Sequence, residues 1–318
     1  MHSENPSIDI HEIETAYKRI QPYIHHTPVF TCATINNQCN AAIFFKCENF
    51  QKVGAFKFRG ACNAVFSLTQ EEIQRGVATH SSGNHAQALA LAANMRGAKA
   101  YIVMPNTAPQ VKIDAVRGYE ANITFCEPTL DARETTLNKI VNETGACFIP
   151  PYNDTRIIAG QGTAAVEMLN QVPPLDRIIA PVGGGGLLSG TAIAVSERSP
   201  QTKIIGAEPQ QADDAYRSFQ AGYLIPVEHP NTIADGLRTS LGTLTFPIIQ
   251  KRVHEIVTVS ENAIIEAMRL IWERMKIIIE PSSAVPLAAL LQEKVVAADK
   301  RIGIILSGGN VDLQKLPW

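Results

Sequence analysis

Lys57 stands between two phenylalanines, Phe56 and Phe58, in a segment whose residues favour a helix. Most lysines lie on the solvated surface, and that is the simplest interpretation of this one. An apolar setting, however, lowers the pKa of an amine and makes it a nucleophile or a Schiff-base former. Lys57 is therefore the first candidate catalytic residue.

Four consecutive glycines, Gly183, Gly184, Gly185 and Gly186, follow an apolar, β-branched segment. A turn without side chains lets successive N–H groups close round a phosphate at the start of a helix. The loop is not a nucleotide P-loop, because no Gly-Lys-Ser/Thr follows, and Ser189 stands where the dinucleotide fingerprint needs its third glycine. Since each glycine costs backbone entropy, four together favour phosphate binding over a purely structural turn.

Two polar loops follow other predicted strands. The first, Ser81-Ser82-Gly83-Asn84, presents hydroxyls and N–H groups at the start of a helix, which suits an anion such as a carboxylate. Serine and asparagine are also favoured helix caps, so an ordinary N-cap is the alternative interpretation. The second loop, Ser307-Gly308-Gly309-Asn310, is either a plain turn or a device that sets a hydroxyl beside a ring nitrogen.

Short apolar runs alternate with helical patterns along the chain. The predicted strands cover residues 42–47, 76–80, 100–104, 123–126, 177–182, 203–207, 256–259 and 301–306. The predicted helices cover residues 84–95, 130–143, 160–170, 261–275 and 283–291. Strand followed by helix, repeated, predicts an α/β fold with parallel sheets that carry helices on both faces. Sites in such folds lie beyond the carboxyl ends of the strands, which is where the polar loops fall.

The composition excludes several classes of protein. The 318 residues are 45% hydrophobic and 18% charged, which argues against a disordered chain. A formal net charge of -2 argues against a nucleic-acid binder, because such a protein usually carries a basic excess. The uncharged stretch 178–195 is long enough for a membrane span, but Pro181 and the four glycines would break a lipid-facing helix. With scattered cysteines and no signal peptide visible at residues 1–6, we expect a cytoplasmic protein without membrane contact.

Three hypotheses compete at this point. A dinucleotide-dependent oxidoreductase would use Glu208 to bind a ribose, but the fingerprint fails, and Lys57 and the 81–84 loop are left without a task. A non-catalytic amino-acid-binding module has no reason to keep Lys57 between two phenylalanines. A pyridoxal phosphate enzyme needs a Schiff-base lysine, a phosphate loop and a partner for the pyridine nitrogen, and candidates for all three are present.

Together these residues resemble the fold-type II pyridoxal phosphate enzymes, in particular the serine racemases and the serine/threonine dehydratases. The resemblance runs from about Ile10 to Asp312. The motifs that carry it are Lys52-Val-Gly-Ala-Phe-Lys-Phe-Arg-Gly-Ala61, Ser81-Ser-Gly-Asn-His-Ala-Gln87, Gly160-Gln-Gly-Thr163, Pro181-Val-Gly-Gly-Gly-Gly186 and Ser307-Gly-Gly-Asn-Val-Asp312. It implies two sheets as in the β subunit of tryptophan synthase, with a large cofactor-binding domain at 1–70 and 154–318 and a small domain at 71–153.

The resemblance also implies roles for single residues. Lys57 would form the Schiff base, Phe56 would lie against the cofactor ring, and Asn84 would bond the ring oxygen. The four glycines would hold the phosphate, and Ser307 would face the pyridine nitrogen and leave it mostly unprotonated. The residues implied in substrate binding are Ser81, Ser82, Arg133, Asn153 and Gly236.

Ser82 bears on the reaction that the resemblance implies. Lys57 would remove the α-proton from one face; loss of a β-hydroxyl then leads to a keto acid and ammonia, whereas reprotonation from the opposite face gives the other enantiomer. Ser82 is that second group in serine racemases, and many threonine dehydratases have alanine there. The implied activity is a serine racemase that also dehydrates L-serine and L-threonine. The alternative is a threonine or threo-3-hydroxyaspartate dehydratase, since yeast-type hydroxyaspartate dehydratases keep the serine pair, and Ser82 would then only cap the helix.

Effectors and assembly are implied in the same way. The 208–214 segment matches the place where the family binds Mg2+ or Ca2+, with Glu208, Asp214 and the Ala212 carbonyl as hard oxygen ligands. A solvated acidic turn is the alternative. A site for ATP as an activator would include Lys52, Gln87, Lys112, Tyr119 and Lys276, although Val53 replaces a threonine there. We expect a small amino-acid substrate and a homodimer.

Overall fold

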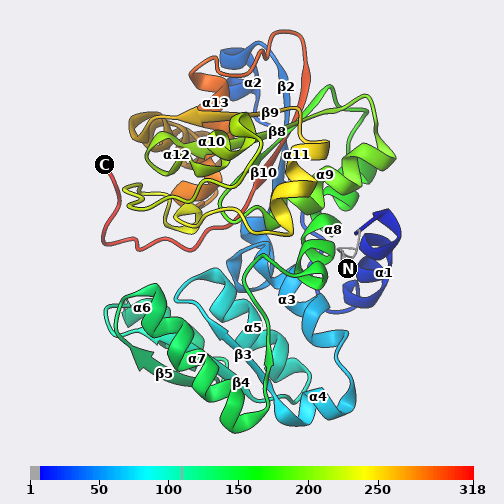
Figure 1. Ribbon diagram of the computed structural model, residues 1–318. Helices are drawn as coiled ribbons and strands as arrows, with labels where there is room; N and C mark the ends of the chain where they lie inside the picture. The colour runs from blue at the N-terminus through cyan, green and yellow to red at the C-terminus, as the bar shows by residue number, and fades with distance from the viewer. Residues whose placement is uncertain (1–7, 109) are drawn as a thin grey trace.

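Two sheets organise the chain in the computed structural model, which describes residues 8–108 and 110–318 (Figure 1). The larger sheet has six strands in the order β1-β2-β10-β7-β8-β9, and the smaller has four in the order β5-β4-β3-β6. Every strand pair is parallel except that of β1 with β2. The predicted α/β fold with two parallel-type sheets is therefore confirmed. The prediction about residues 1–6 lies outside the described residues.

The strands lie close to their predicted positions. The larger sheet contains β1 (Val29–Phe30), β2 (Ala42–Cys47), β7 (Arg177–Pro181), β8 (Lys203–Pro209), β9 (Glu255–Val259) and β10 (Arg301–Leu306). The smaller sheet contains β3 (Val77–His80), β4 (Ala100–Pro105), β5 (Asn122–Cys126) and β6 (Cys147–Phe148). The sequence pattern does not predict β1 and β6, because a strand of two residues is too short to show an alternation.

Helices connect the strands and cover both sheets. The α-helices are α1 (Ile10–Ile20), α2 (Ala33–Cys39), α3 (Lys57–Phe66), α4 (Gln70–Arg75), α5 (Asn84–Met95), α6 (Gln110–Arg117), α7 (Leu130–Thr144), α8 (Thr155–Gln171), α9 (Gly186–Arg198), α10 (Asp214–Ala221), α11 (Thr245–Arg252), α12 (Glu261–Met275) and α13 (Pro281–Leu291). The 3-10 helices are η1 (Glu48–Phe50), η2 (Lys52–Gly54), η3 (Gln210–Ala212) and η4 (Asp235–Leu237).

Helices α3 and α8 lie between the two sheets and fix the position of Lys57 (Figure 1). Helix α8 begins at 155 rather than at the predicted 160, because the Asp154 side chain caps it and accepts the N–H groups of Arg156 and Ile157. A Cβ on Gly160 would lie 2.6 Å from the Cα of Gly60. The two glycines therefore let α3 and α8 approach more closely than side chains would allow.

A buried cluster of charges also anchors α3. Arg59 is fully buried and donates hydrogen bonds to both carboxylate oxygens of Glu48 and of Glu167. Lys46, also fully buried, donates to Glu167 at 2.8 Å. Two cations and two carboxylates balance, which is the condition under which buried charges are tolerated. Arg59 is two residues from Lys57, so this cluster holds the start of α3 in place.

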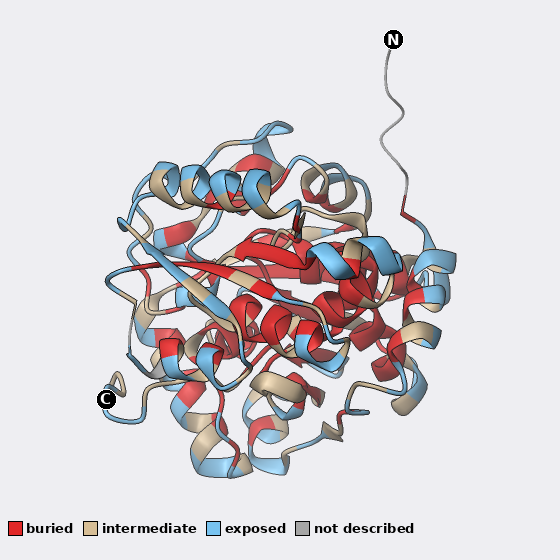
Figure 2. Cartoon of the chain, turned by 90° about the horizontal axis from the view of Figure 1, so that it is seen from below, coloured by how far each residue is buried: buried red, intermediate tan, exposed pale blue. Residues whose placement is uncertain are grey.

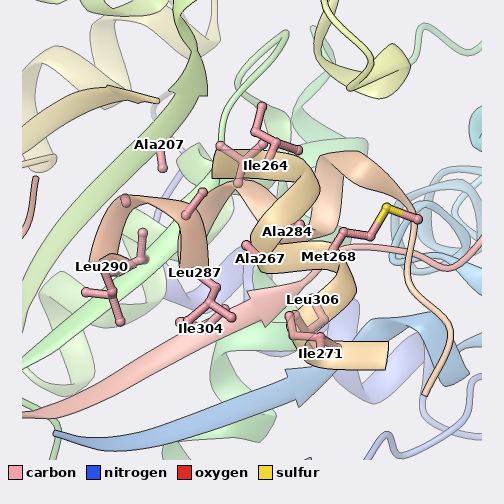
Figure 3. Packing of buried hydrophobic residues seen from close by; sticks show 14 of the residues in the cluster. Ala207, Ile264, Ala267, Met268, Ile271, Ala284, Leu287, Leu290, Ile304 and Leu306 are labelled. Atoms are coloured by element: carbon pink, nitrogen blue, oxygen red, sulfur yellow. The ribbon is translucent and has the colours of Figure 1, made fainter. Parts of the chain in front are cut away.

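The main apolar core lies on one face of the larger sheet. Helices α12 and α13 pack there, and Figure 3 shows Leu287 of α13 beside Ile304 of β10 and Ile271 of α12 beside Leu306 of β10. In Figure 2 the buried residues fill the centre of the molecule, and the outer helices show exposed faces. Among the described residues, none of the helices combines the length and apolarity needed to cross a bilayer.

Candidate active site

Lys57 begins α3 and points toward the segment that follows β6. Its Nζ donates a hydrogen bond to the Pro151 carbonyl at 2.7 Å and lies 5.3 Å from the centre of the Phe56 ring. Burial lowers the pKa of Lys57 to about 8, although the nearby Glu280 carboxylate opposes this shift. A pKa near 8 leaves a usable fraction of free amine at neutral pH, as a nucleophile or a base requires.

The two loops that the sequence analysis singled out at residues 52–57 and 307–310 are bonded together. The Phe56 N–H donates to the Ser307 carbonyl at 3.0 Å, and the Gly309 N–H donates to the Gly54 carbonyl at 2.9 Å. An isolated antiparallel bridge joins Ala55 to Gly308. The segment that leads to Lys57 is thus fixed by the loop after β10, and the start of α3 is fixed by the bonds of Arg59 to Glu167 of α8.

Asn84, the first residue of α5, faces the same space. Its Nδ2 donates to both carboxylate oxygens of Glu280 at 3.0 Å, and its Oδ1 accepts a hydrogen bond from Asn310 at 2.9 Å. Burial raises the pKa of Glu280 to about 7, and the negative charge of Asp235 adds to the effect. The structure therefore brings Lys57, Asn84 and Glu280 together at one site.

The four glycines form the turn from β7 into α9. Gly185 has φ +87, in the region that disfavours side chains, and no side chain caps the helix. A Cβ on Gly184 would come within 2.3 Å of the Tyr152 ring, and one on Gly185 within 2.8 Å of Leu241. The surroundings thus exclude side chains, and the free N–H groups at the start of α9 suit a phosphate.

Ser307 begins the loop after β10 and is buried. Its hydroxyl lies 3.1 Å from that of Ser283, which can also donate to the Gly308 carbonyl at 2.6 Å. Either serine can be the donor in this pair, and the Ser307 hydroxyl can also turn its hydrogen toward an aromatic nitrogen. His85 lies close enough to Lys57 for the lysine charge to act on it, and burial lowers the pKa of His85 to about 3, so it stays neutral.

The Ser81 and Ser82 loop is not an ordinary cap. The N-cap of α5 is Gly83, and no side chain caps the helix. Ser81 Oγ accepts the Gly83 N–H at 3.3 Å, whereas the Ser82 hydroxyl makes no hydrogen bond within the described part of the chain. The interpretation of Ser82 as a helix cap is therefore wrong, because the helix begins one residue later than that role requires and no side chain caps it.

The other residues implied in substrate binding have different surroundings. Arg133 is half-buried on α7, where its Nε donates to the Thr129 carbonyl at 3.3 Å and its charge acts on His80 at the end of β3. Asn153 is already bonded at both ends of its amide, to Thr243 and to the Leu244 N–H. The Gly236 N–H donates to Ser282 Oγ at 3.2 Å.

The three residues predicted to bind a metal lie at the start of α10. Glu208 accepts the N–H groups of Ala215 and Tyr216, and Asp214 accepts that of Leu241. Burial raises the pKa of Asp214 to about 7 and that of Glu208 well above its ordinary value. No basic side chain pairs with either carboxylate among residues 8–108 and 110–318.

Ala212 belongs to η3, directly before this pair, and is buried. Throughout the described residues, no three His, Cys, Asp or Glu side chains gather into a metal cluster. A cation here would therefore have two carboxylates, one carbonyl and waters, which is a ligand set for Mg2+ or Ca2+.

The five residues matched to an ATP site come from several elements of both the larger and the smaller part of the chain. Lys52 Nζ lies 5.8 Å from the Phe58 ring, and Lys112 makes an ion pair with Asp235 of η4. The remaining three are Gln87, which is buried in α5, Tyr119, which follows α6, and Lys276, which ends α12. Within the described chain, no hydrogen bond or ion pair joins any two of the five.

Three residues of the site are absent from the sequence prediction. Glu280 is the one acid in the apolar run Ile277-Ile-Ile-Glu-Pro281, and that isolation is a usable signal. Asn310 lies inside a motif that the sequence analysis quoted, but its partners come from distant segments. Tyr152, whose ring covers Gly184, has no signal in the sequence.

Comparison with known proteins gives a consistent result. Residues 20–308 match the family model described as "Pyridoxal-phosphate dependent enzyme". A beta-hydroxyaspartate dehydratase of Paracoccus denitrificans is 54% identical over 303 residues, which cover 95% of this chain and 96% of that protein. A serine racemase of Dictyostelium discoideum is 51% identical over 316 residues, or 98% of this chain and 97% of that protein.

Solved structures agree in fold. The crystal structure of the Dictyostelium discoideum serine racemase has a TM-score of 0.92 at 52% identity, covering 96% of this chain and 99% of that one. The structure of maize serine racemase has a TM-score of 0.94 at 46% identity, with coverage of 96% and 94%. A threonine deaminase crystal structure has a TM-score of 0.92 at 42% identity, with coverage of 96% and 99%.

The lysine, the glycine loop and the two-sheet fold are the parts that an α/β enzyme with a phosphorylated, Schiff-base-forming cofactor needs. The chain belongs to the family of pyridoxal-phosphate dependent enzymes. When bound, this cofactor supplies the electron sink that acidifies the α-proton of an amino acid. The residues present fit it, since the amine of low pKa, the excluded side chains at the glycine loop and the donor at Ser307 match its parts.

Proposed function

We propose that the protein is a serine racemase that also dehydrates L-serine and L-threonine. The observation that carries the proposal is Ser82. Gly83, rather than Ser82, is the N-cap of α5. Ser82 lies in the loop that leads to Asn84, and its hydroxyl makes no hydrogen bond within the described residues. A second proton-transfer group is what a racemase needs beyond the lysine. Serine racemases among the relatives support the proposal.

Lys57 and Ser82 divide the proton transfers in this scheme. Lys57 Nζ, once free, takes the α-proton from one face, and its lowered pKa suits a base near neutral pH. The Ser82 hydroxyl returns a proton to the opposite face, which gives the enantiomer. Where the substrate loses its β-hydroxyl as water, hydrolysis of what remains releases a keto acid and ammonia.

The substrate is a small amino acid whose carboxylate lies at the start of α5. We assign its binding to Ser81, Asn153, Arg133 and the backbone at Gly236. Arg133 is best suited, because its Nε makes one long hydrogen bond at 3.3 Å and its other N–H groups have no partner among the described residues. Asn153 has to give up its bond to Thr243 or Leu244 before it can contact a substrate.

The second candidate function is a dehydratase for threonine or threo-3-hydroxyaspartate without significant racemisation. The relative that is 54% identical over 303 residues is a beta-hydroxyaspartate dehydratase, and this is the observation that favours it. A substrate with two carboxylates would use the guanidinium of Arg133 for one and the N–H groups and hydroxyls of the 81–84 loop for the other.

We further propose a Mg2+ or Ca2+ ion at Glu208, Asp214 and the Ala212 carbonyl. Two buried carboxylates without a basic partner in the described chain support it. Asp214 accepts the Leu241 N–H, and Leu241 packs against Gly185 of the glycine loop. A cation there would stabilise the phosphate site through this contact.

Assembly, location and domain division complete the proposal. We further propose a cytoplasmic homodimer, and the six free cysteines of the described residues fit a reducing compartment. The two separate sheets support a large domain at 1–70 and 154–318 and a small domain at 71–153. ATP as an activator has the weakest support, because Lys112 is already paired with Asp235.

A substrate panel tests the proposed function. The purified protein, loaded with pyridoxal phosphate, is given L-serine, D-serine, L-threonine or threo-3-hydroxyaspartate, with and without Mg2+ and ATP. We expect both enantiomers of serine and pyruvate from either serine. Turnover of hydroxyaspartate without any racemisation of serine would replace the first candidate by the second.

A further inference from the structure

Asn310 links two other segments of the site, at Val53 and at Asn84, through one amide group. Its Nδ2 donates to the Val53 carbonyl at 2.7 Å and to Asn84 Oδ1 at 2.9 Å. We propose that Asn310 is a positioning residue that fixes which end of the Asn84 amide faces the cofactor ring oxygen. This inference deepens the proposed cofactor site and rests on it.

A backbone carbonyl, which can only accept a hydrogen bond, sets the orientation of the Asn310 and Asn84 amides. The two ends of an asparagine amide are nearly equal in shape, and their bonding partners decide which end lies where. The Val53 carbonyl can only accept, so the nitrogen of Asn310 must face it. The two hydrogens of that nitrogen then serve two acceptors, Val53 O and Asn84 Oδ1.

The backbone conformation around Val53 keeps its carbonyl directed at Asn310. Val53 has φ 56, a left-handed conformation that is unusual for a β-branched residue. The next residue, Gly54, donates to the Gln51 carbonyl at 2.9 Å and accepts from the Gly309 N–H at 2.9 Å. A Cβ on Gly54 would lie 2.9 Å from Asn310 Oδ1, so this glycine also makes room for the Asn310 amide.

The consequence appears at Asn84. With its Oδ1 held by Asn310, its Nδ2 lies on the side of Glu280 and donates to both carboxylate oxygens at 3.0 Å. One N–H can serve a carboxylate in this way, and the other remains for the ring oxygen of the cofactor.

Glu280 alone does not enforce this orientation. Burial raises its pKa to about 7, and a protonated carboxyl can donate as well as accept. It therefore accommodates either end of the Asn84 amide over part of the neutral pH range, whereas the Val53 carbonyl does not titrate. The other charged groups that act on this part of the site are Lys57, Asp235 and Lys112.

The test is Asn310→Asp in the cofactor-loaded protein. The substitution keeps the shape but leaves only acceptors, so the Asn84 amide should turn its nitrogen away from the ring oxygen. The readout is the pH at which the visible absorbance of the lysine-linked cofactor changes. We expect it to rise by about one unit, because the ring oxygen loses a hydrogen bond that favours its ionised form.

Asn84→Ala supplies the control, since the new carboxylate also acts through its charge. In the Asn84→Ala background, Asn310→Asp should shift the pH of the absorbance change by less than half as much, because the Asn84 amide that would turn is absent. Asn49→Asp adds the same charge near Gly309 without contact to Asn84, and it should shift the pH of the absorbance change only a little. If the Asn310→Asp protein does not bind the cofactor, Asn310→Ala takes its place, with Asn84 present and with Asn84→Ala. We then expect a smaller shift in the pH of the absorbance change.

Equal shifts with and without Asn84, or no shift in either background, would overturn the role of Asn310. An unaltered protein without any lysine-linked absorbance is a different failure. It would overturn the proposed cofactor site itself, and the inference with it.

Discussion

Replacing Glu167 by glutamine should strongly destabilise the protein, because it unbalances the buried charge cluster under Lys57. Glu167 accepts from Arg59 at 2.8 Å through both oxygens and from Lys46 at 2.8 Å, and all three side chains are at most 1% exposed. Glu167→Gln leaves two buried cations for one carboxylate. Breaking a buried ion pair on one side costs about 3–5 kcal/mol.

The cost should depend on pH, because Lys46 can lose its proton. Burial already lowers the pKa of Lys46, and Glu167 is one of the charges that oppose this. Without Glu167 the folded pKa falls further below the unfolded one, so the unfolded state binds more protons and stability rises with pH. The deficit of the variant should therefore be smaller at pH 9 than at pH 7.

Thermal unfolding at equal cofactor concentration measures both effects. From the slope of about 2–4 °C per kcal/mol for somewhat smaller proteins, we expect the melting temperature to fall by roughly 5–10 °C at pH 7. The matched control is Glu71→Gln, which breaks the exposed Arg75–Glu71 pair and should change it by about 1 °C at most. A fall of less than about 2 °C for Glu167→Gln would refute the reasoning.

Three further predictions concern the site and its surroundings. Gly184→Ala should weaken pyridoxal phosphate binding at least about tenfold, because its Cβ would come within 2.3 Å of the Tyr152 ring; Gly118→Ala, with its nearest neighbour at 3.4 Å, should leave the dissociation constant unchanged. The folded pKa of Glu280 is raised to about 7, so this group costs stability as pH rises from about 4.5 through 7, and the cofactor-free Glu280→Gln protein should lose less melting temperature than the parent between pH 5 and 8. Mg2+ should raise the melting temperature more at pH 8 than at pH 5, since Asp214 has a pKa of about 7, and Asp214→Asn should abolish the effect; an equal effect in that variant would place the ion elsewhere.

The sequence predicts the architecture well because the elements that define it are long and periodic. The predicted helices at 84–95 and 261–275 match α5 and α12, and the strands at 42–47 and 301–306 match β2 and β10. The sequence prediction fails where an element is too short to show a hydrophobic period, or where a helix cap rather than the period decides where the helix begins. β1 and β6 are too short to show a period, and the cap at Asp154 begins α8 before the predicted helix.

The site is predictable where one loop carries the chemistry and unpredictable where partners come from distant segments. The lysine, the glycine loop and Ser307 each follow from a local pattern. The bond from Asn84 to Glu280 and that from Asn310 to Val53 join residues 196 and 257 positions apart, and no spacing rule relates them. The Lys46, Arg59 and Glu167 cluster is hidden for the same reason, since charged residues in an isolated sequence look solvated.

The central claim is that Ser82 exchanges the proton on the face opposite Lys57, and Ser82→Ala tests it most directly. Its fold should not change, because Gly83 rather than Ser82 is the N-cap of α5. From L-serine, formation of D-serine should fall about 100-fold or more, as expected when a general acid is removed, while pyruvate formation should stay within about threefold. D-serine formation that persists in Ser82→Ala at a rate near that of the unaltered protein would contradict the account.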